Sequence, residues 1–326
     1  MRKIVFFNNK GGVGKTSLVY HLAWMYADLG RRILAVDLDP QANLTSMFLD
    51  EESLEILWDN GSDDQTIYTA IEPRIKGLGD IQTFSPRTIS SNIGLIPGDL
   101  RLSSFEADLS SDWYGCADKK ESAFRTESAF HRIIEAAIGA FEADLVLIDV
   151  GPNLGAINRS AMITAADVVV PLAPDLFSLQ GLKNLGPTLS EWREQWQDRK
   201  QKTHSDDLSL PNAEMRPIGY VLAKYNTMNK RHLKYYERWM ARIPNIYRKS
   251  VLQEWSISEI PEKIEQDPHC LAILKDYHSL MPMAMEARKP MFLLKPADGV
   301  IGAHVESVSN CYKDFRKLAN AIDSKG

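Results

Sequence analysis

The residues with the clearest chemistry lie near the start of the chain, in a glycine-rich segment. It follows an apolar run at residues 3–7 and precedes a stretch whose apolar residues recur at helical spacing. A turn of this kind between a strand and a helix can direct backbone N–H groups at phosphate oxygens. Lys15 could then reach the β- and γ-phosphates, and the Thr16 hydroxyl could bind Mg²⁺. We therefore predict a phosphate-binding loop (P-loop) for ATP and Mg²⁺, rather than an accidental glycine turn, formed by Lys10, Gly11, Gly12, Val13, Gly14, Lys15, Thr16 and Ser17.

Three acidic residues follow apolar runs farther along the chain. Asp37 and Asp39 come after the run at residues 32–36, and Asp149 closes the run at residues 145–148. Alternation along a strand puts Asp37 and Asp39 on the same side, toward the carboxyl edge of the sheet where α/β proteins bind ligands. Asp149 has the form of a Walker B aspartate, which holds Mg²⁺. The competing interpretation of Asp37 and Asp39 is that they cap the next helix.

These residues need a parallel sheet to bring them together. A strand at residues 3–7, a helix at 15–29 and a strand at 32–36 form a βαβ unit, and further buried strands are expected at 92–97, 144–150, 167–172 and 217–224. The pattern predicts an α/β fold with three layers, a mostly parallel twisted sheet with helices on both faces. We expect one domain over residues 1–326, with loop insertions near 109–125 and 195–212. The stretch 109–125 is polar and contains a glycine, which suggests an exposed loop.

The composition is that of an ordinary globular protein. Of the 326 residues 44% are hydrophobic, and the net charge is -5, so affinity for nucleic acid would need a local basic patch. The three cysteines are far apart and have no CxxC spacing, which favours neither a disulfide framework nor a zinc site. No apolar run is long enough to span a membrane. We expect a cytoplasmic protein.

The P-loop departs from the usual spelling in a way that indicates a family. Position 9, where the first glycine is usual, is Asn9, and an additional lysine follows it. The segment Lys10–Thr16 resembles the deviant Walker A motif of the ParA/MinD family of ATPases, in particular the ParA/Soj-type partition ATPases. The resemblance implies that Lys10 crosses a nucleotide-sandwich dimer and touches the ATP of the partner subunit. There it would stabilise negative charge on the phosphoryl group during hydrolysis.

A second motif extends the likeness. The string Asp37-Leu38-Asp39-Pro40-Gln41-Ala42-Asn43-Leu44-Thr45 is similar to the family's DxDPQxNxT motif. The resemblance implies that Asp39 positions the attacking water, and that Asp37 holds the local geometry or contacts the water shell of Mg²⁺. Catalysis would thus depend on Lys10, Lys15 and Asp39. Mg²⁺ would be bound by Thr16, Asp37 and Asp149.

Further strings carry the resemblance over nearly the whole chain. Residues 156–162 and 287–292 look like the family, and the stretch 178–182 matches a helix at its dimer face, although simple core packing would explain it equally well. The family usually shows DxPP after the Walker B strand, whereas this chain has Val150-Gly151-Pro152-Asn153. We expect the loop at 151–155 to be mobile and to resemble the family's switch loop, although it lacks the DxPP sequence. Asn226, at the end of a predicted strand, is our candidate for adenine recognition.

A basic stretch follows this asparagine. Residues 224–249 hold eight lysines and arginines against one glutamate. Spacing close to four places several of them on one helix face, where they could contact phosphates, although a solvated helix face is the bland alternative. ParA proteins bind DNA without sequence preference as ATP-bound dimers. The candidate DNA contacts are Lys230, Arg231, Lys234, Arg238, Arg242 and Arg248.

The resemblance implies a slow ATPase that dimerises on ATP binding, binds DNA nonspecifically and is stimulated by a ParB-like or other partner, in plasmid or chromosome partitioning. If DNA binding holds, the protein would associate with the nucleoid. Two alternatives stay open: a ParA-like ATPase that positions another cargo or serves a regulatory or defence system, and a P-loop metabolic ligase or kinase. We expect no membrane anchor, because the apolar stripe of the last helix suits core packing. We also expect no Fe–S cluster, because no cysteine lies shortly after the Asp149 strand, where the iron-protein relatives of the family have one.

Overall fold

The computed structural model describes residues 1–58, 65–203, 207–225, 237–256, 261, 263–277 and 279–326. Its centre is one eight-stranded sheet in the order β3-β4-β2-β5-β1-β6-β7-β8. Only β3 runs antiparallel to its neighbour β4. The strands are β1 (Arg2–Phe6), β2 (Ile33–Asp37), β3 (Arg87–Ser90), β4 (Ile93–Ile96), β5 (Leu145–Asp149), β6 (Asp167–Leu172), β7 (Arg216–Tyr225) and β8 (Cys270–Lys275).

The central strands are nearly continuous apolar runs because both faces of the sheet are covered. Every residue of β2, β5 and β6 is buried, as expected for parallel strands with helices on both sides. The predicted strands are confirmed, and so is the predicted fold class. Two strands were not predicted from the sequence. They are β3, a short and partly exposed edge strand, and β8, at the opposite edge of the sheet.

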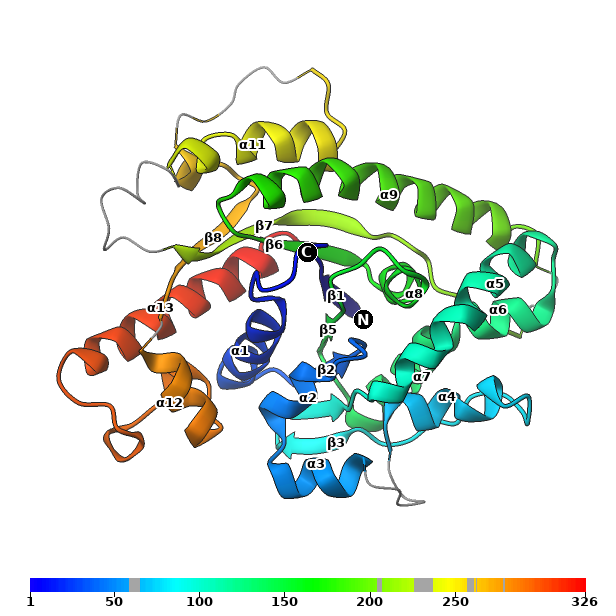
Figure 1. Ribbon diagram of the computed structural model, residues 1–326, viewed down its shortest axis with the longest axis horizontal. Coiled ribbons are helices and arrows are strands. Elements are labelled where there is room, and N and C mark those ends of the chain that lie inside the picture. Colours follow the sequence, from blue (N-terminus) through cyan, green and yellow to red (C-terminus); the bar gives the residue numbers. More distant parts are fainter. Residues whose placement is uncertain (59–64, 204–206, 226–236, 257–260, 262, 278) are drawn as a thin grey trace.

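Helices form a layer on each face of the sheet (Figure 1). One apolar core joins the sheet to α1 and α13, with α2, α3 and α12 around them; the other joins it to α4 through α9 and α11. The bounds are α1 (Lys15–Asp28), α2 (Asn43–Phe48), α3 (Glu51–Trp58), α4 (Ile67–Ile75), α5 (Phe105–Ala117), α6 (Glu121–Glu127), α7 (Ala129–Phe141), α8 (Ala156–Thr164), α9 (Leu176–Lys200), α11 (Ile243–Ile246), α12 (Leu280–Ala287) and α13 (Ala303–Asp323).

The expectation of an exposed loop at residues 109–125 is wrong. This stretch belongs to α5 and α6. Leu109, Trp113 and Cys116 are buried and recur at helical spacing, so α5 has an apolar stripe although most of its other residues are polar. The indole of Trp113 stacks on Trp196 of α9 with ring centroids 5.9 Å apart. Of the second expected insertion, residues 195–200 are the last part of α9, and residues 207–212 contain neither helix nor strand.

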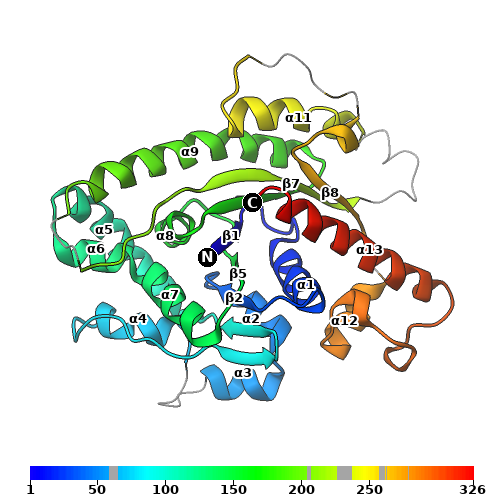
Figure 2. The same cartoon turned by 180° about the vertical axis from the view of Figure 1, so that it is seen from behind.

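The segment at residues 237–252 lies against α9, on the side of that helix away from β7 (Figure 2). Gly186 of α9 makes this close approach possible, because a Cβ there would overlap the carbonyl of Ser250. A π-helical turn, η2 (Tyr247–Val251), follows α11. No helix of the described ranges is both long and apolar enough to cross a membrane.

Candidate nucleotide-binding site

The P-loop connects β1 to α1 and leaves the N-terminus of α1 open. Gly12 and Gly14 have φ values of 74° and 87°, in the left-handed region that favours glycine. Gly14 is the N-cap residue of α1, no side chain caps the helix, and its first turn has no acidic residue. The first N–H groups of a helix lack partners within the helix and attract anions. This end of α1 therefore suits a phosphate group.

Lys15 lies buried within the loop. Its Nζ donates to the carbonyl of Asn8 at 3.1 Å and lies 3.5 Å from the carbonyl of Lys10. Burial lowers the pKa of Lys15, whereas the charges of Asp149 and Asp39 raise it. The lysine, the P-loop and two of the predicted acidic residues thus share one site.

Asp37 is held in place by hydrogen bonds. It lies beside Asp149 in the register of β2 and β5. Its Oδ2 accepts from the backbone N–H and hydroxyl of Thr45 at 2.8 and 2.7 Å, and its Oδ1 accepts from the N–H of Asp39 at 3.2 Å. Burial raises the pKa of Asp37, and the bonds from Thr45 lower it. Because both oxygens are engaged, this geometry suits bracing the loop after β2 better than binding a cation directly.

Asp149 differs from Asp37 in its hydrogen bonding. Both carboxylate oxygens are fully buried, and among the described residues neither has a hydrogen bond of standard geometry. Burial raises the pKa of Asp149 well above its ordinary value and the charge of Asp37 adds to this, while the nearby Thr16 hydroxyl and Lys15 lower it. A buried carboxylate without a partner is costly. Mg²⁺ prefers oxygen ligands and keeps several waters, so Asp149 and Thr16 fit a hydrated Mg²⁺ ion.

Asp39 lies in the loop after β2, next to the loop at residues 151–155. Its Oδ1 accepts from the N–H of Gln41 at 3.0 Å. A Cβ on Gly151 would lie 3.4 Å from the same oxygen, so the two loops are in close proximity. The Nδ2 of Asn158 donates to the carbonyls of Gly151 and Asn153 at 2.8 and 2.6 Å. The loop after β5 is thereby tied to the first turns of α8.

Lys10 extends toward the start of α9. Its amine forms an ion pair with Asp175, and it lies 5.9 Å from the ring centroid of Phe177. Asp175 is also the N-cap of α9, where its Oδ1 accepts from the N–H of Ser178 at 2.9 Å. The backbone N–H of Lys10 donates to Oδ1 of Asn8 at 2.9 Å.

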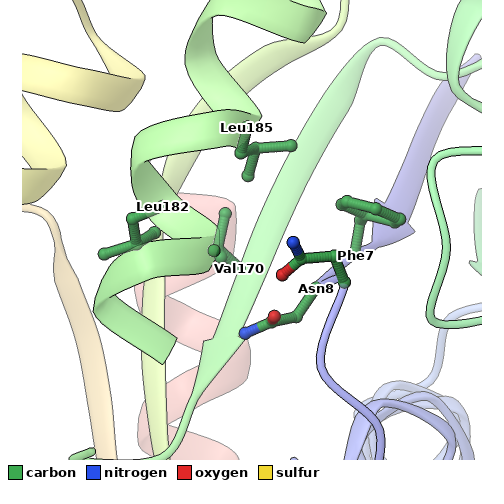
Figure 3. Close-up of a pocket in the computed structure, with 7 residues that line it drawn as sticks. Phe7, Asn8, Val170, Leu182 and Leu185 are labelled. Atoms are coloured by element: carbon green, nitrogen blue, oxygen red, sulfur yellow. The ribbon is translucent and has the colours of Figure 1, made fainter. Parts of the chain in front are cut away.

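Figure 3 shows why the P-loop and α9 are close. Phe7 and Asn8, which follow β1, face Leu182 and Leu185 of α9, with Val170 of β6 beside them. The space that these residues enclose is too small to admit a water molecule, so it is a packing gap and not a ligand site.

The structure describes only part of the predicted adenine and DNA contacts. The adenine candidate Asn226 lies outside the described residues, as do the DNA candidates Lys230, Arg231 and Lys234. Arg238 and Arg242 are exposed, and their guanidinium carbons lie 5.5 and 5.3 Å from the ring centroid of Trp239.

Arg248 does not fit a DNA contact. It is only 7% exposed, and its Nη2 donates to Asp267 at 2.7 Å. Since this ion pair is buried, the guanidinium is turned into the protein and away from solvent. The exposed basic residue at this point of the chain is Lys249.

Four residues of the site were missed in the sequence. Thr45 and Asn158 lie in strings that resemble the family, but no role was given to them. Glu106 of α5 accepts from the N–H groups of Ala156 and Ile157 at 2.6 and 2.9 Å, a long-range contact that no local pattern predicts. Asp175 could have been found, because an aspartate three residues before Ser178 at the start of an apolar helical stretch is typical of an N-cap.

Comparisons with known proteins agree with this arrangement. A family model described as "AAA domain" matches residues 1–202. The chromosome partitioning protein ParA of Myxococcus xanthus is 33% identical over 190 residues, which are 58% of this chain and 58% of that protein. The aligned stretch spans about half the length of several curated relatives.

Solved structures match over the whole chain. A protein from Corynebacterium diphtheriae has a TM-score of 0.71 at 24% identity, and the match covers 100% of this chain and 98% of that one. A structure described as a plasmid partition protein from Borrelia burgdorferi bound to AMPPNP has a TM-score of 0.59 at 18% identity, covering 100% and 99%. These likenesses show the fold. The family match over residues 1–202 establishes that the chain belongs to the AAA domain family, and the curated ParA relative identifies it as the ParA/MinD type.

Proposed function

We propose that this chain is a switch that binds ATP, dimerises around it, binds DNA without sequence preference and releases it after ATP hydrolysis. The observation that carries the proposal is the presence, in one site, of an open helix N-terminus at the P-loop and of the buried carboxylate of Asp149, which among the described residues accepts no hydrogen bond of standard geometry. The first suits the phosphates of ATP, and the second suits the cation that accompanies them.

Each residue of the site has a defined task in this proposal. The backbone of residues 11–17 surrounds the phosphates, and Lys15 neutralises their charge. Thr16 and Asp149 hold Mg²⁺, which when bound supplies positive charge at the phosphate oxygens. Asp39 accepts a hydrogen bond from the attacking water and so orients it, while Asp37 keeps Asp39 in place through their hydrogen bond. The products are ADP and phosphate.

The surface next to the P-loop supports the dimer. Leu176 and Phe177, at the start of α9, are 52% and 73% exposed, and the ring of Phe177 lies beside the amine of Lys10. Large exposed apolar side chains at an active site often mark an interaction surface. We assign this surface to the second subunit, whose ATP Lys10 would reach.

For DNA binding we propose the exposed cations Arg238, Arg242 and Lys249, together with Lys230, Arg231 and Lys234, and we leave out Arg248. The guanidinium groups of Arg238 and Arg242 both lie beside the ring of the buried Trp239. Two copies of these residues in a dimer would double the number of phosphate contacts. We further propose a role in plasmid or chromosome partitioning, with a ParB-like partner that stimulates hydrolysis.

The test measures the ATPase rate and the oligomeric state of the purified chain, with and without random DNA. We expect slow hydrolysis that requires Mg²⁺, a dimer only with ATP, and DNA binding that is lost when ATP is replaced by ADP. Hydrolysis that depends on a small acceptor molecule would instead indicate a metabolic enzyme.

A further inference from the structure

The ion pair between Lys10 and Asp175 joins two elements that are far apart in the sequence. Lys10 lies in the P-loop, and Asp175 is the residue before α9. The side chains are 31% and 22% exposed, so the pair is partly shielded from solvent. The ring of Phe177 lies against the same amine. In the free chain, Lys10 is therefore bound within its own subunit.

The two oxygens of Asp175 have separate tasks. Oδ1 accepts from the N–H of Ser178 and caps α9, and Oδ2 pairs with Lys10. A cap requires only a hydrogen-bond acceptor, which asparagine also supplies. The negative charge of Asp175 is thus not needed to start the helix, and it acts mainly on Lys10.

We propose that Asp175 is an internal counter-ion that restrains Lys10 in the free subunit and so raises the threshold for dimerisation. This inference rests on the proposed function, in which Lys10 must reach the ATP of the partner subunit. ATP brings phosphate groups that compete with Asp175 for the amine. The contact breaks when two loaded subunits meet, and it forms again after they separate.

The size of the effect follows from the exposure of the pair. A partly exposed ion pair shifts an equilibrium by up to about fivefold. Each dimer breaks two such contacts, so the dissociation constant of the dimer would change by up to about 25-fold.

The experiment compares the wild-type chain with Asp175→Asn, which keeps the cap and removes the charge. The matched control is Asp198→Asn, because Asp198 is an exposed acid on the same helix whose partner is Lys202 and not Lys10. Two quantities are measured. One is the rate at which an acylating reagent modifies Lys10 without nucleotide, relative to the exposed Lys183, by mass spectrometry. The other is the dimer dissociation constant with ATP and Mg²⁺, by analytical ultracentrifugation.

We expect Asp175→Asn to speed the acylation of Lys10 several-fold and to lower the dimer dissociation constant by up to about 25-fold, with Asp198→Asn equal to wild type. An unchanged acylation rate would overturn the resting contact. Faster acylation with a weaker dimer would also overturn the proposal, because Asp175 would then be needed in the dimer itself. If every variant stays monomeric with ATP while acylation is faster, the proposed function fails and the resting contact alone stands.

Discussion

Lowering the pH should destabilise the folded chain, because it would protonate one buried histidine on the helix that follows the P-loop. His21 lies on α1 and is fully buried. Its Nδ1 contacts the carbonyl of Ser17 at 2.7 Å, and its Nε2 accepts from the N–H of Met291 at 3.2 Å. The ring also stacks on Phe315, with centroids 5.0 Å apart. Because Nε2 accepts a hydrogen bond, the ring must be neutral with its proton on Nδ1.

The magnitude follows from the pKa. Burial lowers the pKa of His21 from 6.5 to about 4, although the bond to Ser17 opposes this. The unfolded chain takes up a proton near pH 6.5, whereas the folded chain resists protonation until about pH 4. The stability that the folded chain gains from a neutral His21 is therefore fully present above pH 6.5, and it is lost as the pH falls toward 4. At pH 5 the loss amounts to about 2 kcal/mol.

The assay is denaturant unfolding of the wild-type chain and of His21→Gln at pH 7 and pH 5. Glutamine can donate and accept hydrogen bonds but does not titrate. Burial also lowers the pKa of His131 to about 4, but His131 is present in both proteins, so its contribution cancels. Between the two pH values, wild type should lose about 2 kcal/mol more than His21→Gln. Equal losses would refute the reasoning.

Four further predictions concern the packing of α9, the Mg²⁺ site, the basic surface and the buried Arg248. Gly186→Ala should reduce the free energy of unfolding by about 1–3 kcal/mol, because the added Cβ would overlap Ser250. The control is Gly139→Ala on α7, where an added Cβ meets nothing within 4 Å. In the same denaturation experiment the control should not be destabilised. Asp149→Asn should raise the Mg²⁺ concentration needed for half-maximal ATPase activity by about 10–100-fold. An unchanged Mg²⁺ dependence would show that Asp149 does not bind the cation. Replacing Arg238 and Arg242 by alanine should reduce the slope of log DNA affinity against log salt by about 2. Arg248→Ala should leave that slope unchanged and lower the unfolding free energy by about 3 kcal/mol, because Asp267 loses its buried partner.

Much of the fold could be read from local patterns. The central strands are continuous apolar runs, and the first helix has a clear apolar stripe, so their place in a parallel sheet followed from the sequence. The edge strand β3 could not be read in the same way, because its four residues are partly exposed and gain order mainly from pairing with β4. Helix α5 was missed because only a narrow stripe of it is apolar.

The site shows the same division. The P-loop and the acidic residues after β2 and β5 are local motifs, and the structure brings them to one edge of the sheet. Their catalytic roles stay predictions. Contacts between distant segments were not accessible from the sequence. The contact of Glu106 with α8, the pair of Lys10 and Asp175, and the burial of Arg248 against Asp267 each depend on the tertiary fold.

The central claim is that ATP makes this chain a dimer through Lys10. The most direct measurement is the molar mass in solution, by light scattering, of wild type, Lys10→Ala and Asp39→Ala with no nucleotide, with ADP, and with ATP and Mg²⁺. We expect wild type to dimerise only with ATP, Asp39→Ala to remain dimeric longer because hydrolysis is impaired, and Lys10→Ala to stay monomeric. A wild-type chain that is monomeric in every nucleotide state, or a Lys10→Ala variant that dimerises and hydrolyses ATP normally, would contradict the account.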